Sequence, residues 1–138
     1  FPYDLYHRPQ NAFVAKFLGM DNLVEAEIIG RDPLTVRTPI GVFHLEKHPP
    51  IDSEDIQLLI RPEAGIIVVD GGDRPNAIHG KLENISFRGR HRIVTMSVPS
   101  VQGQVILKFA LDHSVILPAD QPEIRVSLRP SELMLVRI

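Results

Sequence analysis

The sequence predicts a mainly β protein in which two related β units follow a short N-terminal helix. Residues 56–68 (IQLLIRPEAGIIV) and 124–136 (IRVSLRPSELMLV) share Ile, Arg, Pro and Val at the same offsets, which indicates a duplicated unit. Short runs of alternating apolar residues, separated by turns rich in Gly and Pro, fill most of the remaining chain. A helical pattern of apolar residues is confined to the N-terminal region.

The predicted helix covers residues 12–18. Asn11 precedes it as an N-terminal cap, and Gly19 follows where a left-handed C-terminal cap is expected. The pairs Phe13/Phe17 and Val14/Leu18 are spaced at i,i+4 and therefore share one face. We expect this apolar face to pack against a partner surface.

Everything after the helix is predicted to be β structure. In the first unit, strands are expected at 23–29, 34–37 and 42–45, with a turn at 39–41, and then at 56–60 and 66–69. In the second unit they are expected at 78–87 with a break at Gly80, and at 91–98, 105–111, 124–128 and 134–136. Residues 112–122 are expected to be irregular, with a short strand at 115–117 as the alternative. Short strands and tight turns at this spacing favour a small barrel of the oligonucleotide/oligosaccharide-binding (OB) kind over an α/β sheet.

The chain is accordingly divided into four parts. Residues 1–21 are predicted to be a helical connector, 22–70 the first β unit, 71–76 a linker and 77–138 the second β unit. The linker contains Gly71, Gly72 and Pro75, which are typical of a loop. The two units together are expected to form one OB-like domain.

The repeated Arg-Pro step predicts a corner in each unit. Pro62 and Pro130 lack the N–H that a neighbouring strand requires, so the strand before each proline must end there. Arg61 and Arg129 stand at these corners. Their guanidinium groups either satisfy nearby carbonyls or a carboxylate such as Glu63, which is the structural alternative, or they bind a ligand.

Three arginines at alternating positions, Arg88, Arg90 and Arg92, form the sharpest local charge feature. On one side of an extended hairpin they could meet an anion or a phosphate backbone. The alternative is a solvated hairpin tip. Single-strand binders also use stacking aromatic side chains, and Phe87 is the one candidate nearby.

No pattern of catalytic or metal-binding residues stands out. Gly80-Lys81 is followed by Leu82 rather than Ser or Thr and lies in a strand pattern, so a phosphate-binding loop is not expected. The histidines form no dense ligand motif, and no pair of carboxylates is singled out. The histidines of the chain are His7, His44, His48, His79, His91 and His113. We therefore expect no catalytic residue, cofactor or metal in this chain.

Composition excludes several classes of protein. The chain has 138 residues, 43% hydrophobic and 23% charged, which suits one ordinary domain or two small ones sharing a core. It has no cysteine, which excludes a disulfide framework and a thiol nucleophile. The net charge of −2 gives no global field toward nucleic acid. No apolar run reaches the roughly 20 residues that span a bilayer. Because the chain opens at Phe1 in structured-looking sequence, we expect it to be a piece of a longer protein.

The N-terminal stretch PYDLYHRPQNAFVAKFLGMDN resembles the segment that leaves the ATPase core of import-type ABC transporter subunits. The matching residues are Pro2, Leu5, Tyr6, Arg8, Pro9, Asn11, Phe13, Val14, Ala15, Phe17, Leu18, Gly19 and Asn22. Downstream, LLIRPEAGIIV and VSLRPSELMLV are similar to the two Arg-Pro-Glu-like signatures of the regulatory TOBE (transport-associated OB) domain. The second signature departs from that pattern because Ser131 stands in the position of Glu63.

This resemblance implies a non-catalytic regulatory and dimerisation domain of an ATP-binding subunit that energises import of sugars, polyamines, iron or oxyanions. The parent would use ATP and Mg and would work as a homodimer with its own ATPase core and the permease. It would lie at the cytoplasmic face of the membrane, and a small molecule or a protein could act on it as an effector. The alternative is an OB-fold module that binds single-stranded nucleic acid, although nucleic acid is not the expected partner.

Overall fold

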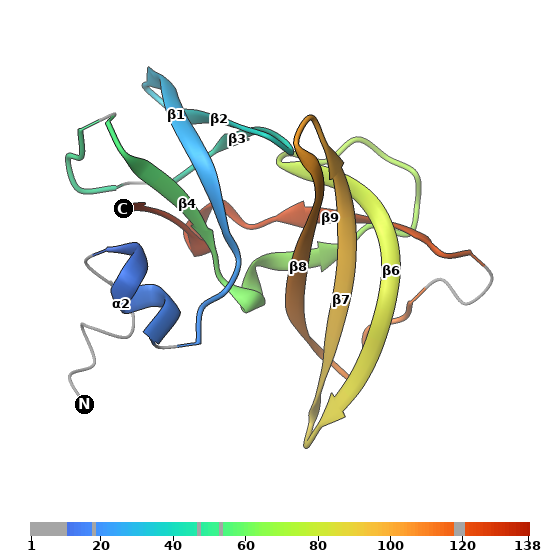
Figure 1. Ribbon diagram of the computed structural model, residues 1–138. Helices are drawn as coiled ribbons and strands as arrows, with labels where there is room; N and C mark the ends of the chain where they lie inside the picture. The colour runs from blue at the N-terminus through green and yellow to red at the C-terminus, as the bar shows by residue number, and fades with distance from the viewer. Residues whose placement is uncertain (1–10, 18, 47, 53, 118–120) are drawn as a thin grey trace.

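The computed structural model describes residues 11–17, 19–46, 48–52, 54–117 and 121–138. Two antiparallel five-stranded sheets account for most of them (Figure 1). The first sheet has the order β10 (Leu133–Arg137), β4 (Ile56–Ile60), β1 (Leu23–Arg31), β2 (Leu34–Thr38), β3 (Gly41–His44). The second has the order β5 (Gly65–Ile67), β9 (Glu123–Leu128), β6 (Ala77–Arg88), β7 (His91–Ser100), β8 (Gly103–Asp112). The predicted mainly β, OB-like architecture is confirmed.

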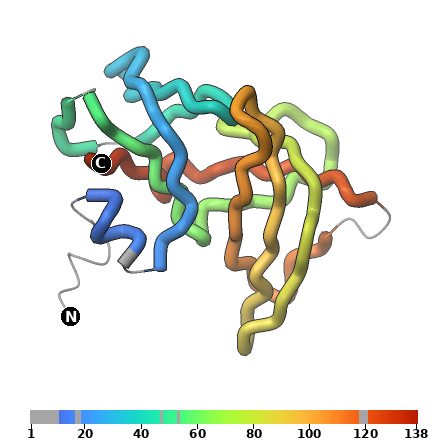
Figure 2. The backbone as a smooth tube through the Cα atoms, viewed as in Figure 1, coloured from blue at the N-terminus to red at the C-terminus, as the bar shows by residue number. Residues whose placement is uncertain are grey.

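The two repeats exchange their last strands. After β4 the chain turns through a short 3₁₀ helix, η1 (Pro62–Ala64), and its next strand, β5, joins the other sheet beside β9. After β9 it turns through η2 (Pro130–Glu132), and β10 returns to pair with β4. In the tube of Figure 2 the red C-terminal strand accordingly runs back beside the green β4. Each sheet therefore contains strands from both repeats.

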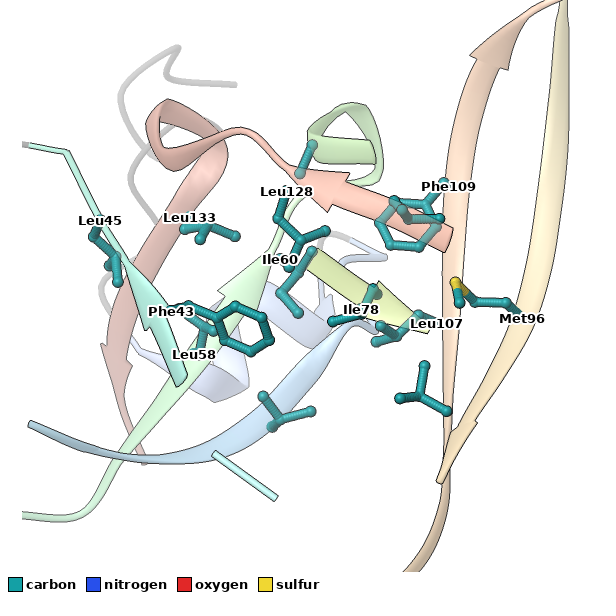
Figure 3. Close-up of a cluster of buried hydrophobic side chains, with 14 of the residues drawn as sticks. Phe43, Leu45, Leu58, Ile60, Ile78, Met96, Leu107, Phe109, Leu128 and Leu133 are labelled. Atoms are coloured by element: carbon teal, nitrogen blue, oxygen red, sulfur yellow. The ribbon is translucent and has the colours of Figure 1, made fainter. Parts of the chain in front are cut away.

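One hydrophobic core joins the two sheets. Alternate residues of the repeated strands, such as Leu58 and Ile60 in β4 and Val126 and Leu128 in β9, are buried with the inward residues of β7 and β8. Figure 3 shows Phe43 and Leu58 of the first sheet on one side of this core and Phe109 of the second on the other. Because this core is shared, neither repeat buries its apolar residues alone.

The N-terminal helix α2 (Ala12–Phe17) has the predicted caps. The amide of Val14 donates to Oδ1 of Asn11 at 2.9 Å. Gly19 has a φ of +81°, and the amide of Met20 donates to the carbonyl of Ala15 at 2.9 Å, as in a Schellman cap. The predicted last residue, Leu18, lies outside the described residues.

Phe13, on the predicted apolar face, is 77% exposed, so no surface in the described part of the chain covers it. The buried face is instead formed by Ala12 and Ala15, which pack with Leu59 and Val136 on the outer side of the first sheet. Small side chains on this face let the helix backbone lie close to the sheet, so the larger Phe13 points away. No helix in the described part of the chain is long and apolar enough to cross a membrane.

One strand prediction needs correction. Gly80 does not break a strand, because β6 runs continuously from Ala77 to Arg88 with a bulge between Leu82 and Asn84. A Cβ at Gly80 would lie 2.3 Å from the carbonyl oxygen of Ser97, so the glycine allows the backbones to approach closely. The alternative short strand at 115–117 does not form, and those residues are a bend and irregular backbone after β8, in the segment expected to be irregular.

Candidate functional site

The two Arg-Pro corners lie against each other and exchange main-chain hydrogen bonds. The amide of Arg61 donates to the carbonyl of Glu132 at 3.1 Å, and the amide of Arg129 donates to the carbonyl of Ala64 at 2.9 Å. The repeat places Arg61 opposite Arg129 in register and Ala64 opposite Glu132. The two bonds are therefore equivalent, and the corners form one approximately twofold junction where the chain passes between sheets.

The arginine side chains at this junction contact the protein itself. Nη1 of Arg129 donates to the carbonyl of Glu63 at 2.6 Å, and Nη2 of Arg61 lies 3.6 Å from Sδ of Met134. Arg61 is half-buried, whereas Arg129, Glu63 and Ser131 are exposed. These contacts fit the interpretation in which the guanidinium groups satisfy nearby groups of the protein. Binding of an effector at this corner stays a prediction; the corner consists of Arg61, Pro62, Glu63, Arg129 and Pro130.

Two buried asparagines, which the sequence reasoning missed, bind the two units together. Nδ2 of Asn22 donates to the carbonyl of Lys108 at 2.7 Å, and Oδ1 accepts from the amide of Lys108 at 2.9 Å. Asn76 makes the same pair of bonds with the main chain of His44, both at 2.8 Å. The main-chain carbonyl of Asn22 also accepts from the amide of Ile60 at 2.9 Å. In the same way, the carbonyl of Asn76 accepts from the amide of Leu128 at 3.0 Å.

A weak sequence signal could have found these residues. Asn22 and Asn76 each stand directly before the first strand of a unit, in NLVEAEI and NAIHGKL, which share Asn and an alternating apolar pattern. The bonds satisfy both polar groups of one residue in an edge strand of the opposite sheet. Burial leaves Asn22 only 4% and Asn76 7% exposed, so water cannot readily replace these bonds.

The arginines of the β6–β7 hairpin do not share one side. Arg88 is paired with His91 and Phe87 with Arg92, so Arg88 and Arg92 point to opposite faces of the sheet. Nη2 of Arg92 donates to the carbonyl of Asp112 at 3.1 Å and also to the carbonyl of Val115. Arg92 therefore ties the hairpin to the turn after β8, and only Arg88 and Arg90 remain exposed as candidates for an anion patch.

This hairpin extends beyond the rest of the two sheets at the bottom of Figure 1. Phe87 is 76% exposed near its tip, but it lies on the face opposite to Arg88 because the two residues are consecutive in a strand. A stacking aromatic and the exposed arginine thus do not form one platform for a single strand. The hairpin offers exposed charge on one face and an exposed aromatic ring on the other.

A shallow groove of about 640 Å³ lies beside the turn after β1 and the loop after β3. Its floor includes the apolar side chains of Leu34, Leu45 and Ile51, and Asp32 and Glu46 are among the charged residues that line it. Apolar surface combined with a few charged groups is the usual composition of a small-molecule site. The groove is therefore a second candidate place for an effector.

The histidines do not gather into a metal site. Among the residues that the structure describes, no group of three or more His, Asp or Glu side chains could hold a metal ion. His48 has a structural position, because Nε2 accepts from the amide of Leu135 at 3.0 Å and Nδ1 lies 2.7 Å from the carbonyl of Pro49. His7 lies outside the described residues.

The carboxylate of Asp112, paired with His91 near the tip of the β6–β7 hairpin, has a lowered pKa. The amide of Ser114 donates to Oδ1 of Asp112 at 2.9 Å and, with the Ser114 hydroxyl, lowers the pKa of that carboxyl below its ordinary value. His113 lies 3.3 Å from the same carboxylate. Because Asp112 is exposed, this arrangement is a turn-stabilising contact and not a buried acid poised for catalysis.

The Gly80–Lys81 segment does not form a phosphate-binding loop. Gly80 and Lys81 lie inside the continuous strand β6, and the backbone of Gly80 packs against Ser97. A phosphate site of the P-loop kind requires a loop whose amides point to the phosphates at the start of a helix. A continuous strand has no such loop, so Gly80 and Lys81 do not supply a site of this kind.

Comparison with known proteins reveals relatives among import ATP-binding proteins. The chain is 35% identical over 95 residues to the spermidine/putrescine import ATP-binding protein PotA of Clostridium novyi, covering 65% of this chain and 24% of the relative. PotA of Mycoplasmopsis synoviae is 27% identical over 120 residues, covering 84% and 26%. The Fe(3+) ions import ATP-binding protein FbpC of Streptomyces coelicolor is 32% identical over 90 residues, covering 65% and 23%.

The chain spans about a quarter of the length of these curated relatives. No protein-family model matches it. The similarity to import ATP-binding subunits inferred from the N-terminal and Arg-Pro segments is confirmed by these relatives, and the mainly β fold is consistent with a C-terminal domain of such a subunit.

Proposed function

We propose that this chain is the C-terminal, non-catalytic regulatory and dimerisation domain of an ATP-binding subunit that energises solute import. The observation that carries the proposal is the similarity of 64–84% of the chain to import ATP-binding proteins. In this proposal the parent subunit is an ABC-type ATPase that binds ATP and Mg in a separate core. It works with transmembrane permease subunits at the cytoplasmic face of the membrane.

The Gly80–Lys81 segment supports the proposal that ATP is hydrolysed in a separate core and not in this domain. A core that hydrolyses ATP needs a phosphate-binding loop, and the Gly80–Lys81 segment is a strand packed against Ser97. The domain division also belongs to the proposal, with 1–21 as the connector, 22–70 and 77–138 as the β units and 71–76 as the linker. Asn22, the first residue of the first unit, and Asn76, the last residue of the linker, make equivalent bonds to the opposite sheet and support this division.

Regulation follows if an effector binds this domain differently in the open and closed states of the parent dimer. A ligand shifts such an equilibrium only by its differential affinity for the two states. The Arg-Pro junction and the groove lined by Leu34, Leu45 and Ile51 are the two candidate places. The relatives are named for the import of two different solutes, polyamines and ferric ions, so the proposal assigns no solute to this chain.

The test compares the full-length parent with a version that ends before residue 22. The truncated protein is expected to retain ATP hydrolysis while losing response to the effector and part of its dimerisation. The 138-residue chain alone is expected to show no ATP hydrolysis. Hydrolysis by the chain alone, or unchanged dimerisation and regulation after truncation, would contradict the proposal.

The alternative function is single-stranded nucleic-acid binding, which the exposed Arg88 and Arg90 favour. The opposite orientation of Phe87 and the contacts of Arg92 with the turn after β8 weaken it. A titration with labelled single-stranded DNA at several salt concentrations separates the two functions. Tight binding that weakens steeply with salt would support the alternative, and its absence is expected.

A further inference from the structure

Asn22 stands where three parts of the fold meet. It lies two residues after Met20, which closes the C-terminal cap of α2, and directly before β1. Its carbonyl accepts from the amide of Ile60 in β4, and its side chain holds both main-chain groups of Lys108 in β8. One residue thus connects the helix, the first sheet and the edge of the second sheet.

The helix packs directly on the first sheet. Ala12, Ala15 and Met20 are buried in one cluster with Leu59 and Val136 of the neighbouring strands β4 and β10. Residue Leu59 precedes Ile60, whose amide is bonded to Asn22. A displacement of α2 must therefore either move Asn22 or break the packing of the helix on Leu59 and the bond between Asn22 and Ile60.

Asn76 provides an internal comparison. It makes equivalent bonds to His44 and accepts from Leu128, but it is the last residue of the linker 71–76 and does not follow a helix. The duplication therefore supplies two similar joints, of which only the one at Asn22 is attached to a helix. The difference between them isolates the contribution of the helix.

We propose that Asn22 is the joint that couples α2 to the second sheet, so that movement of the helix is transmitted to β8. The amide of Asn22 is buried, and its separation from Lys108 would leave two main-chain groups without partners. Breaking the joint is therefore costly, and the helix and the edge of β8 open together. The use of this coupling as a relay from an ATPase rests on the proposed function, whereas the coupling itself does not.

The experiment is native-state hydrogen exchange on the whole chain. Ala15→Gly weakens α2 without touching Asn22, because Ala15 lies on the face of the helix that packs with Leu59. The exchange rates of the Lys108 and His44 amides are then compared, since the first is held by Asn22 and the second by Asn76. A glycine in the helix is expected to speed exchange at Lys108 about five-fold and to leave His44 unchanged.

Asn22→Ala and Asn76→Ala complete the design. With Asn22→Ala in the background, Ala15→Gly should add no further change at the amides of β8, whereas with Asn76→Ala it should still speed exchange at Lys108. An unchanged Lys108 amide in the Ala15→Gly protein, or an equal acceleration at His44, would overturn the proposal. Should Asn22→Ala fail to fold, the comparison of Lys108 with His44 in the single Ala15→Gly variant still decides it. No step uses ATP or a partner, so its failure would leave the proposed function standing.

Discussion

The side-chain amide of Asn22 hydrogen-bonds both main-chain groups of Lys108, a residue 86 positions away in the sequence. Asn76 repeats this relationship with His44 in the opposite direction. The first strand of each β unit is therefore preceded by an asparagine that reaches to an edge strand in the other sheet. Together with the exchanged strands β5 and β10, these bonds make the duplicated sequence one folding unit.

Replacing Asn76 with glycine should destabilise the protein. The variant loses the bonds to the amide and carbonyl of His44 and to the carbonyl of Leu128, while glycine still accepts the φ of +52° found at this residue. Leaving buried main-chain groups unsatisfied is expected to lower the free energy of unfolding by about 2 kcal/mol. Urea denaturation of Asn76→Gly and of a control, Asn84→Ala, measures it. The exposed Asn84 should change stability by less than about 0.5 kcal/mol, and equal losses would contradict the account.

A methyl group at Gly80 should also be poorly tolerated. The added Cβ would lie 2.3 Å from the carbonyl oxygen of Ser97 in the adjacent strand, so β6 and β7 would have to separate. We expect Gly80→Ala to lower the free energy of unfolding by about 2 kcal/mol, as overpacking does. In the matched control, Gly30→Ala, the nearest atom is 3.5 Å away, and thermal unfolding should show little loss. If Gly80→Ala were as stable as Gly30→Ala, the close approach would not exist.

The sequence was sufficient for the strands and corners, because those features depend on local patterns. Pro62 and Pro130 each begin the short 3₁₀ helix at which a strand has ended, and alternating apolar residues identify the buried face. The sequence was not sufficient to predict that β5 and β10 are exchanged between the sheets. The alternating pattern would bury the same residues if each strand stayed in the sheet of its own repeat. The exposure of Phe13 depended on how close α2 lies to Leu59, which local spacing does not determine.

The candidate site also has features that the sequence predicts and features that depend on the folded structure. The Arg-Pro step was visible as a repeat, but the contact of Arg129 with the Glu63 carbonyl depends on the junction of two distant corners. The arginines at 88, 90 and 92 alternate in sequence, yet Gly89 lies in the turn and the strands on either side have independent orientations. Asn22 and Asn76 were overlooked because asparagine before a strand usually indicates only a turn.

The strand exchange predicts that the two halves cannot fold separately. A fragment covering residues 11–70 lacks β10, which pairs with β4, and a fragment covering 71–138 lacks β5, which pairs with β9. Each should give a poorly dispersed amide NMR spectrum alone, and an equimolar mixture should recover dispersed signals because the core is shared. A dispersed spectrum and a cooperative thermal transition for the 11–70 fragment alone would contradict this prediction.

The carboxyl of Asp112 should titrate below its ordinary pKa. The Ser114 amide and hydroxyl stabilise the charged form, so the turn gains stability above the pKa of the unfolded chain and loses it as pH falls through the lower folded pKa. NMR titration of the Asp112 carboxyl carbon measures this. Ser114→Ala should raise the pKa part of the way, because the amide bond of residue 114 remains. A midpoint at the ordinary value in the unmodified protein would show that the turn does not form.

The most direct measurement of the central claim, dimerisation without catalysis, is sedimentation equilibrium of the 138-residue chain over a wide range of concentrations. The account predicts an average mass that rises with concentration toward twice the 15.5 kDa of one protomer. The same samples should release no phosphate from ATP. A strictly monomeric mass at the highest concentration would contradict the assignment of a dimerisation domain.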